Sequence, residues 1–398
     1  MLFRRIRLID GLADRALADR DVRVEGGRIA AIEPHDPSRI VPPGEMVVDG
    51  VGRTLLPGLI DAHAHYTFDP TEGSLQVIAR RSDDEILAAA REHAARALRA
   101  GVTSARGAGS IRGLGWRLRD EIAAGRTPGP RLVAAGTAVG APDGHGIAFG
   151  VGAVGPAALA AATRRVIADG ADVVKVVASE AAMLTTTGHE PGRMVHGAPE
   201  LTLDELRAIV DTAHAAGRRV MAHAQDGESV GRCARAGVDS VEHAWLADDA
   251  AIDALAASGA SLVPTLVVTD VNRTLDGLTP LQRERQDLIE RRHRASTERA
   301  IALGIPLATG TDTGEVGVTA DLVWREAQLI AEHGASAMTA VRSATSSAAR
   351  LLGIDAEVGT IEVGKVADLV VVDGDPLADL RRLAEPVAVF QAGAAVSA

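Results

Sequence analysis

The sequence predicts an α/β protein, a (β/α)8 TIM barrel with a small β-sandwich formed from both termini. Three observations support this fold class: a helix–glycine–strand pattern that recurs through the middle of the chain, strands rich in β-branched residues, and a different composition at the two ends. The 398 residues suffice for one barrel and a small additional module. Hydrophobic residues make up 46% of the chain but aromatic residues only 2%, so the core must consist mainly of Ala, Val, Leu and Ile.

Glycines mark the recurring pattern in the region expected to form the barrel. An Ala-rich helical stretch ends at a glycine and a short β-branched run follows, at Gly101, Gly170, Gly217, Gly237, Gly259 and Gly304. Glycine adopts the left-handed conformation that ends a helix before the chain reverses into a strand. With the runs 59–63 and 131–135 there are eight candidate strands, the last beginning at Ile305. Eight βα units favour a closed barrel over the alternative of an open doubly wound sheet.

The two ends of the chain differ from the middle. Residues 1–56 and 358–398 consist of short alternating runs that Gly and Pro interrupt. We expect these two segments to pair as one composite β-sandwich domain. Residues 57–357 would then form the barrel domain.

Composition excludes several function classes. The formal net charge is -11 and no block of Lys and Arg occurs, so a nucleic acid is not an expected partner. Cys233 is the only cysteine, which excludes an internal disulfide and a thiolate metal cluster. The N-terminus reads as a strand and not as a signal peptide, and no run of about 18 apolar residues occurs. We expect a cytoplasmic protein without membrane contact that acts on a small molecule; a homo-oligomeric state stays open.

The strongest chemical signal is Asp61-Ala-His63-Ala-His65, at the end of the first barrel strand. Residues two apart in a strand point to the same face, so both histidines project toward the barrel axis, where they could bind one cation. A lone His-x-His motif is as often a structural pair as a metal site. The other strand ends favour a metal site, because they carry His223, His243 and Asp312. Barrel active sites form at these ends, and imidazole with carboxylate is a ligand set typical of zinc.

Lys175 lies within the apolar fourth strand, Val-Val-Lys-Val-Val. A buried ammonium there would be costly and would repel nearby metal ions. An ion-paired or snorkelling lysine is the ordinary explanation. A lysine carboxylated by CO2 would instead be an anion able to bridge two metals.

Two segments resemble a known family. Leu55-Leu-Pro-Gly-Leu-Ile-Asp-Ala-His-Ala-His65 and Gly359-Thr-Ile-Glu-Val-Gly-Lys-Val-Ala-Asp-Leu-Val-Val372 are similar to the amidohydrolase superfamily, especially its imidazolonepropionase-like and Xaa-Pro dipeptidase-like branch. The resemblance covers nearly the whole chain. It implies a binuclear site in which one metal, the more buried, is held by His63, His65 and Asp312. It implies that the other is held by His223 and His243, and that a carbamate on Lys175 bridges the two.

The resemblance also implies a reaction. Two divalent metals, with zinc expected, share a hydroxide that attacks an amide, peptide or cyclic C–N bond of a small substrate. Asp312 acts as general base and then as acid toward the leaving amine. His145, in Pro142-Asp-Gly-His-Gly, resembles the family position that donates to the substrate carbonyl or carboxylate.

Departures from the family pattern concern substrate recognition. Relatives often read Thr-Val-Arg-Asp after the second strand, where this chain has Ser104-Ala-Arg106-Gly107, and dipeptidase-like members often have a tyrosine where Gln225 stands. His189, Arg193 and His196 lie in a long Gly/Pro-rich stretch after the fourth strand, which is either a substrate loop or a solvated one.

Two other functions remain as alternatives. A mononuclear deaminase of a heterocycle uses a related barrel, but such enzymes usually lack the fourth-strand lysine. A noncatalytic barrel scaffold is the alternative of another class, since fold does not guarantee activity. Scaffolds of this kind typically lose metal ligands, whereas this chain has all six.

Overall fold

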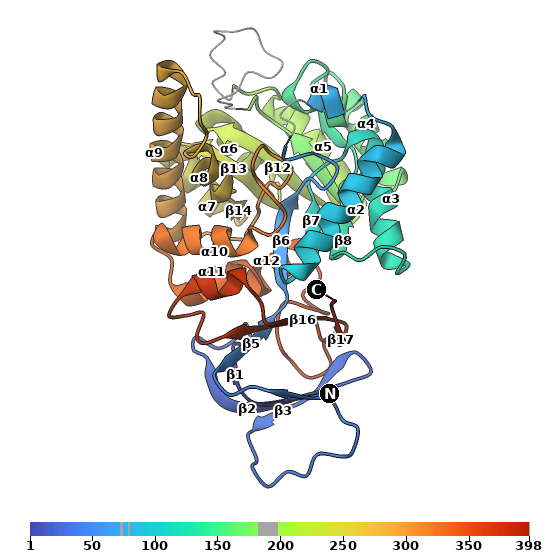
Figure 1. The fold of residues 1–398 in the computed structure, drawn as a ribbon. Coiled ribbons are helices and arrows are strands. Elements are labelled where there is room, and N and C mark those ends of the chain that lie inside the picture. Colours follow the sequence, from blue (N-terminus) through green and yellow to red (C-terminus); the bar gives the residue numbers. More distant parts are fainter. Residues whose placement is uncertain (72–74, 79, 182–197, 398) are drawn as a thin grey trace.

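The computed structural model describes residues 1–71, 75–78, 80–181 and 198–397. Parallel strands form two sheets in the middle of the described chain (Figure 1). The smaller has the order β6 (Leu59–Ala64), β7 (Val102–Gly107), β8 (Arg131–Ala134). The larger has the order β10 (Gly150–Gly152), β9 (Ala138–Gly140), β11 (Val173–Val177), β12 (Arg219–Asp226), β13 (Ser240–Leu246), β14 (Ser261–Val263).

The eighth expected strand, from Ile305, is not formed as a strand; isolated parallel bridges take its place. Leu307 bridges to Leu262, within β14, and Thr313 bridges to Ala64, at the end of β6. Pro306 has no N–H to donate, which limits a regular ladder there. These bridges connect the two sheets on one side. Barrel closure stays a prediction that they support.

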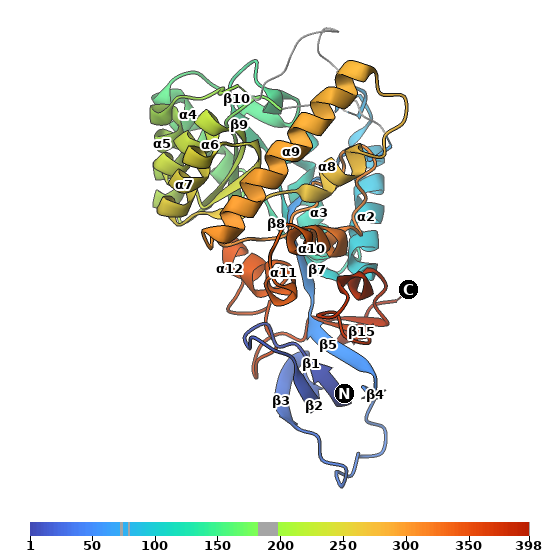
Figure 2. The ribbon, with the colours of Figure 1, turned by 90° about the vertical axis from the view of Figure 1, so that its left-hand side faces the viewer.

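Helices follow most of the parallel strands and cover the outside of the sheets, whereas β8 passes into β9 without one (Figure 2). Their bounds are α1 (Leu75–Ile78), α2 (Asp83–Arg99), α3 (Leu114–Ala123), α4 (Pro156–Ala168), α5 (Leu203–Ala215), α6 (Gly227–Ala236), α7 (Asp249–Ser258), α8 (Leu266–Asn272), α9 (Pro280–Ala302), α10 (Val323–Glu332), α11 (Ala337–Ser343) and α12 (Ser346–Leu352). All six glycines of the recurring pattern have positive φ, from 68° at Gly217 to 118° at Gly170, which confirms their predicted conformation. Among the described residues, no helix is long and apolar enough to span a bilayer.

Strands from both ends of the chain form one sheet. Its order is β17 (Ala394–Ala395), β16 (Ala388–Gln391), β15 (Leu369–Asp373), β5 (Arg53–Pro57), β1 (Leu2–Leu8), β2 (Leu17–Glu25), β3 (Arg28–Pro34), with β4 (Val47–Asp49) paired to β1. The rings of Phe3 and Phe390 pack edge to face, 5.2 Å apart, in a separate apolar cluster. The second layer of a sandwich and the division into two domains stay predictions.

The terminal sheet lies at one end of the molecule, below the parallel strands in Figure 1. The chain passes from β5 through Gly58 directly into β6, which carries His63 near its far end and is followed by His65. The carboxyl ends of the parallel strands therefore face away from the terminal sheet, and the loops that follow them are free to surround a site.

Candidate metal centre

The six side chains predicted as metal ligands come together at one end of the parallel strands. His63 lies in β6, Lys175 in β11, His223 in β12 and His243 in β13. Asp312 lies in the segment bridged to β6, where its N–H donates to the carbonyl oxygen of His63 at 2.7 Å. His65 follows β6 directly. Each of the six is buried, with at most 6% of its surface exposed.

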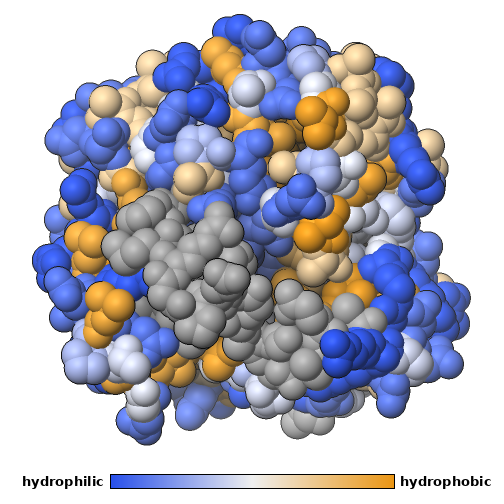
Figure 3. Space-filling view, turned by 90° about the horizontal axis from the view of Figure 1, so that it is seen from above, coloured by the Kyte–Doolittle hydropathy of each residue, from blue (hydrophilic) through white to orange (hydrophobic). Residues whose placement is uncertain are grey.

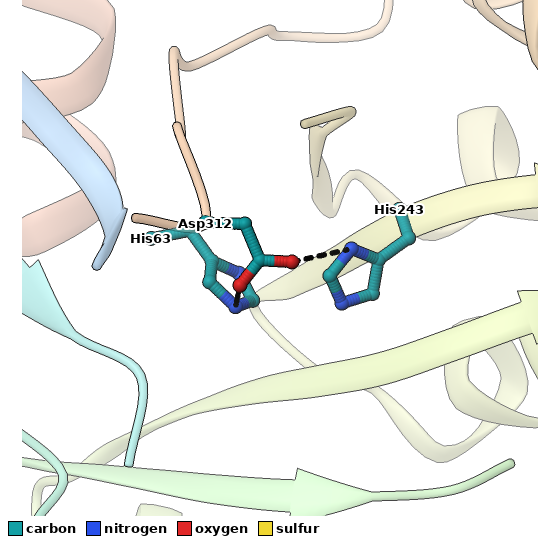
Figure 4. Close-up of side chains that lie close together, drawn as sticks. All are labelled: His63, His243 and Asp312. Carbon is teal, nitrogen blue, oxygen red and sulfur yellow. Dashed lines mark ion pairs between the residues drawn. The ribbon is translucent and has the colours of Figure 1, made fainter. Parts of the chain in front are cut away.

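Asp312 is the centre of this cluster. Its Oδ1 lies 3.3 Å from His63 Nε2 and its Oδ2 lies 3.8 Å from His243 Nδ1 (Figure 4). The same Oδ1 lies 3.4 Å from His65 Nε2. Lys175 Nζ is 3.5 Å from His63 Nε2. The His243 ring continues the cluster to His223, with ring centroids 4.6 Å apart. The predicted residues thus form one contiguous group.

One subset of these residues is compact enough to be a candidate site for an ion. Among the described residues, ligand atoms of His63, His243 and Asp312 all lie within 4.8 Å of one another. The family pattern instead groups His65 with His63 and Asp312. The carboxylate of Asp312 is close to all three rings, so it can serve either grouping.

Hydrogen bonds select the nitrogen that is available on two of the rings. His63 Nδ1 lies 2.8 Å from a Glu242 oxygen and His65 Nδ1 lies 3.0 Å from the Gly109 carbonyl. A carbonyl oxygen only accepts and so does an ionised carboxylate, so Nδ1 carries the proton and Nε2 has the lone pair in each ring. The Nε2 of His223 is buried and has no hydrogen-bond partner among the described residues. These imidazole nitrogens fit a metal ion, which would satisfy them.

Electrostatics in the site also suit a cation. Burial lowers the pKa of His65 to about 3 and holds those of His223 and His243 well below the usual range, so these rings are neutral ligands. Burial opposes ionisation of Asp312, but the neighbouring His63, His65 and Lys175 hold the pKa of that carboxyl well below its usual range. Neutral imidazole with carboxylate is a donor set that zinc and similar divalent ions prefer.

Lys175 differs from nearly every other cation in the chain. Of the 42 lysines and arginines, only Lys175 and Lys365 are lysines. Burial lowers the pKa of Lys175 to about 8, against the opposing attraction of Glu242 and Asp312. An arginine stays protonated in proteins, whereas a lysine can become a neutral amine and react with CO2. This compositional signal was available in the sequence.

Backbone strain is concentrated in the same region, which the sequence did not indicate. Outside glycine, positive φ angles occur at His243 (72°), Ala244 (54°), Thr265 (54°) and Asp312 (58°), among a few other described residues. Such conformations cost on the order of 1–3 kcal/mol each and persist at functional sites. Thr265 Oγ1 lies 2.9 Å from His243 Nδ1, so one strained residue contacts another. The strained backbone at His243 and Asp312 thus coincides with two of the predicted ligands.

The predicted substrate residues lie at the same end but are less closely placed. His145 begins the 3-10 helix η2 (His145–Phe149), is half-buried, and its ring centroid lies 5.0 Å from that of His223. Gln225 is buried, and its N–H donates to Ser179 Oγ at 3.1 Å. His189, Arg193 and His196 lie outside the described residues. Hydrophilic residues dominate this face of the molecule (Figure 3).

Sequence reasoning missed two acidic residues near the site. The backbone N–H of His145 donates to Glu200 Oε1 at 2.7 Å, and burial raises the pKa of Glu200 to about 7. Burial, and then repulsion by Asp312, raises the pKa of Glu315 to about 8. Glu315 follows Asp312 by three residues, and that proximity was a usable signal. Nothing in the sequence placed Glu200 beside His145.

Comparison with known proteins gives concordant matches. The sequence pattern of the amidohydrolase family matches residues 54–396. An ochratoxinase from Aspergillus niger is 28% identical, over 84% of this chain and 73% of that protein. An imidazolonepropionase from Symbiobacterium thermophilum is 29% identical, over 89% of this chain and 83% of that protein. The solved structure of a Xaa-Pro dipeptidase with bound methionine in the active site is 28% identical, with a TM-score of 0.86 over 99% of this chain and 98% of that one. These matches imply a TIM-barrel fold.

Proposed function

This chain belongs to the amidohydrolase family and is a hydrolase of carbon–nitrogen bonds, and from that premise we propose that it works with two divalent metals on a small substrate. The proposed reaction is cleavage of an amide, peptide or cyclic C–N bond. The observation that carries the binuclear form is Lys175, a buried lysine in an arginine-rich chain, 3.5 Å from a histidine of the cluster.

The family pattern assigns the ligands. His63, His65 and Asp312 would hold one metal and His223 with His243 the other, while Lys175, carboxylated by CO2, would bridge them. When bound, two such ions would supply a nucleophile near neutral pH and would polarise the substrate carbonyl. The lone pairs assigned to Nε2 of His63 and His65, and the unpartnered Nε2 of His223, support this arrangement.

The chain's own residues would perform the proton transfers. Asp312 would accept a proton from the attacking water and deliver it to the leaving nitrogen, since it is ionised and central in the cluster. His145 would orient the substrate through its carbonyl or carboxylate. The burial of every predicted ligand would exclude bulk water, which strengthens the electrostatic interactions of the site.

The activities named for the similar proteins indicate which substrate classes to test first. They include a Xaa-Pro dipeptidase, an ochratoxinase and an imidazolonepropionase. Gln225 occupies a position where dipeptidase-like members often have tyrosine, so the pocket for a Xaa-Pro dipeptide is not assumed. We propose dipeptides, N-acyl amino acids and lactams as the classes to screen.

The test is a hydrolysis screen of these three classes with protein loaded with Zn, Co or Mn. We expect turnover of at least one class, lost after chelation and restored by metal. The Asp312→Asn variant is the control for adventitious activity. A protein that binds two metals and cleaves no C–N bond in any class would overturn the proposed reaction.

A further inference from the structure

Arg106 and Glu242 form a buried ion pair directly behind His63. Arg106 Nη2 lies 2.9 and 3.1 Å from the two Glu242 oxygens, and Glu242 Oε2 lies 2.8 Å from His63 Nδ1. Arg106 is 1% exposed and Glu242 is fully buried. The carboxylate thus links a guanidinium on one side to a predicted metal ligand on the other.

The guanidinium is held by further contacts. Arg106 Nε donates to the Ala62 carbonyl at 2.7 Å, and Nη1 donates to Ser240 Oγ at 3.0 Å. Ser240 Oγ also donates to Glu242 Oε1. Arg106 comes from β7, Ala62 from β6 and Ser240 from β13, so the group ties three strands together. Arg106 matches the family's Thr-Val-Arg-Asp pattern, and its side chain lies in the interior.

Stability alone does not account for this pair. Replacing a buried ion pair with neutral side chains of similar volume is often neutral or stabilising, because the desolvation of two charges offsets their attraction. A chain selected only for stability therefore has no need of charges at these positions. The feature that distinguishes this pair is its contact with His63 Nδ1.

We propose that Arg106 and Glu242 are positioning residues for the metal held by His63. This inference rests on the proposed function. An ionised carboxylate that accepts the Nδ1–H of a histidine fixes the tautomer and ring orientation and makes Nε2 a stronger ligand. Arg106 fixes the orientation of the Glu242 carboxylate, because the contacts of its guanidinium with Ala62 and Ser240 fix the orientation of the guanidinium itself.

The experiment uses the double variant Arg106→Met/Glu242→Gln, which removes both charges at once and leaves neither unpaired. We expect the metal-free variant to have near wild-type thermal stability. The dissociation constant of the metal held by His63, called the first metal, should rise by roughly 10- to 100-fold, and this metal should be released faster to a chelator. The visible absorption spectrum of the Co²⁺-loaded variant should also change, because the ligand field of His63 changes. If Arg106 and Glu242 had a purely structural role, the metal affinity and the Co²⁺ spectrum of the double variant would equal those of wild type.

Arg91 and Glu121 supply a matched control. They form a two-contact ion pair between α2 and α3, at 2.7 and 2.9 Å, with no contact to a predicted ligand. Arg91→Met/Glu121→Gln should leave metal affinity and the Co²⁺ spectrum at wild-type values. A change in the control as large as in the double variant would overturn the assignment.

A milder variant covers the case in which the double variant does not fold. Ser240→Ala removes one hydrogen bond from each partner and keeps both charges. It should weaken the first metal site measurably, by a smaller factor. Wild-type affinity and spectrum in whichever variant folds would overturn the inference alone, whereas failure of the wild-type protein to bind any divalent metal would overturn the proposed function as well.

Discussion

Lys175 Nζ lies 3.5 Å from His63 Nε2, in a part of the strand where the lysine is only 1% exposed. The ammonium of Lys175 and a protonated His63 ring would repel each other. Burial lowers the pKa of Lys175 to about 8. A neutral amine in this position can add CO2 and change the sign of its charge. The burial of Lys175 beside His63 therefore bears on whether the proposed site would hold one metal or two.

We predict that Lys175→Ala loses the second metal and nearly all activity, because the variant lacks the amine that would carry the bridging carbamate. A short carboxylic acid added to the variant should restore part of both by replacing the carbamate. Metal analysis and turnover measured with and without the acid check this. Lys365→Ala is the control, since Lys365 is near the surface and pairs with Glu362. Two metals and normal turnover in Lys175→Ala without additive would exclude the carbamate.

Asp312→Asn is expected to reduce turnover by at least about a hundredfold, the scale for loss of a general base. The variant should remain folded, because asparagine has the same shape and the backbone hydrogen bond to His63 is kept. Part of the metal should be lost as well, so turnover is normalised to bound metal. Near-normal turnover per metal would contradict the assignment of Asp312 to proton transfer.

Purified protein should contain close to two divalent metals per chain, as measured by elemental analysis after dialysis. Ions that bind the folded state alone stabilise it, so removal by chelation should lower the thermal unfolding midpoint and readdition should restore it. One metal per saturated chain, with full activity, would favour the mononuclear alternative and leave Lys175 without a bridging role.

Glu326 provides a pH prediction away from the metal ligands. Its two oxygens accept the N–H groups of Leu266 and Val267 at 3.0 and 2.8 Å, and burial raises its pKa from 4.5 to about 8. The folded protein therefore binds this proton more tightly than the unfolded chain, so this contribution to stability is present at low pH and is lost as pH rises toward 8.

The Glu326→Gln variant cannot titrate at this position. Its free energy of unfolding, relative to that of wild type, should therefore rise between about pH 5 and pH 8. Chemical denaturation of the metal-free proteins across this range measures the difference. Glu284→Gln, an exposed change on α9, should show a constant difference. A constant difference for Glu326→Gln too would mean that its carboxyl is ionised throughout.

Phe3→Ala tests whether the two ends of the chain fold together. Phe3 is fully buried against Phe390, so its truncation should cost about 3–5 kcal/mol of unfolding free energy. Phe390→Ala should cost a similar amount, and the double variant should cost less than the sum, because the two rings share one contact. Additive effects would indicate that the rings stabilise the sheet independently.

The sequence by itself predicted the strands β6, β7, β8, β11, β12, β13 and β14 and the residues proposed as ligands, but not the short strands β9 and β10. Local chemistry is sufficient for this: glycines with left-handed backbone end helices, as Gly217 and Gly237 do, and alternation in β6 puts His63 and His65 on one face. Local patterns also favoured a β-sandwich from the two ends of the chain; strands from both ends pair in one sheet, and the second layer stays a prediction. The sequence prediction failed at Ile305, where isolated bridges replace a regular strand.

Only the tertiary structure decided what surrounds those ligands. The Glu242 carboxylate behind His63, the guanidinium of Arg106 and the strained Thr265 beside His243 come from strands and loops far apart in the chain. No local pattern specifies such contacts, because they depend on how neighbouring strands are aligned and on which side chain fills the space between them. Sequence spacing tells which face a residue occupies, whereas packing between strands determines its partner, its burial and hence its charge state.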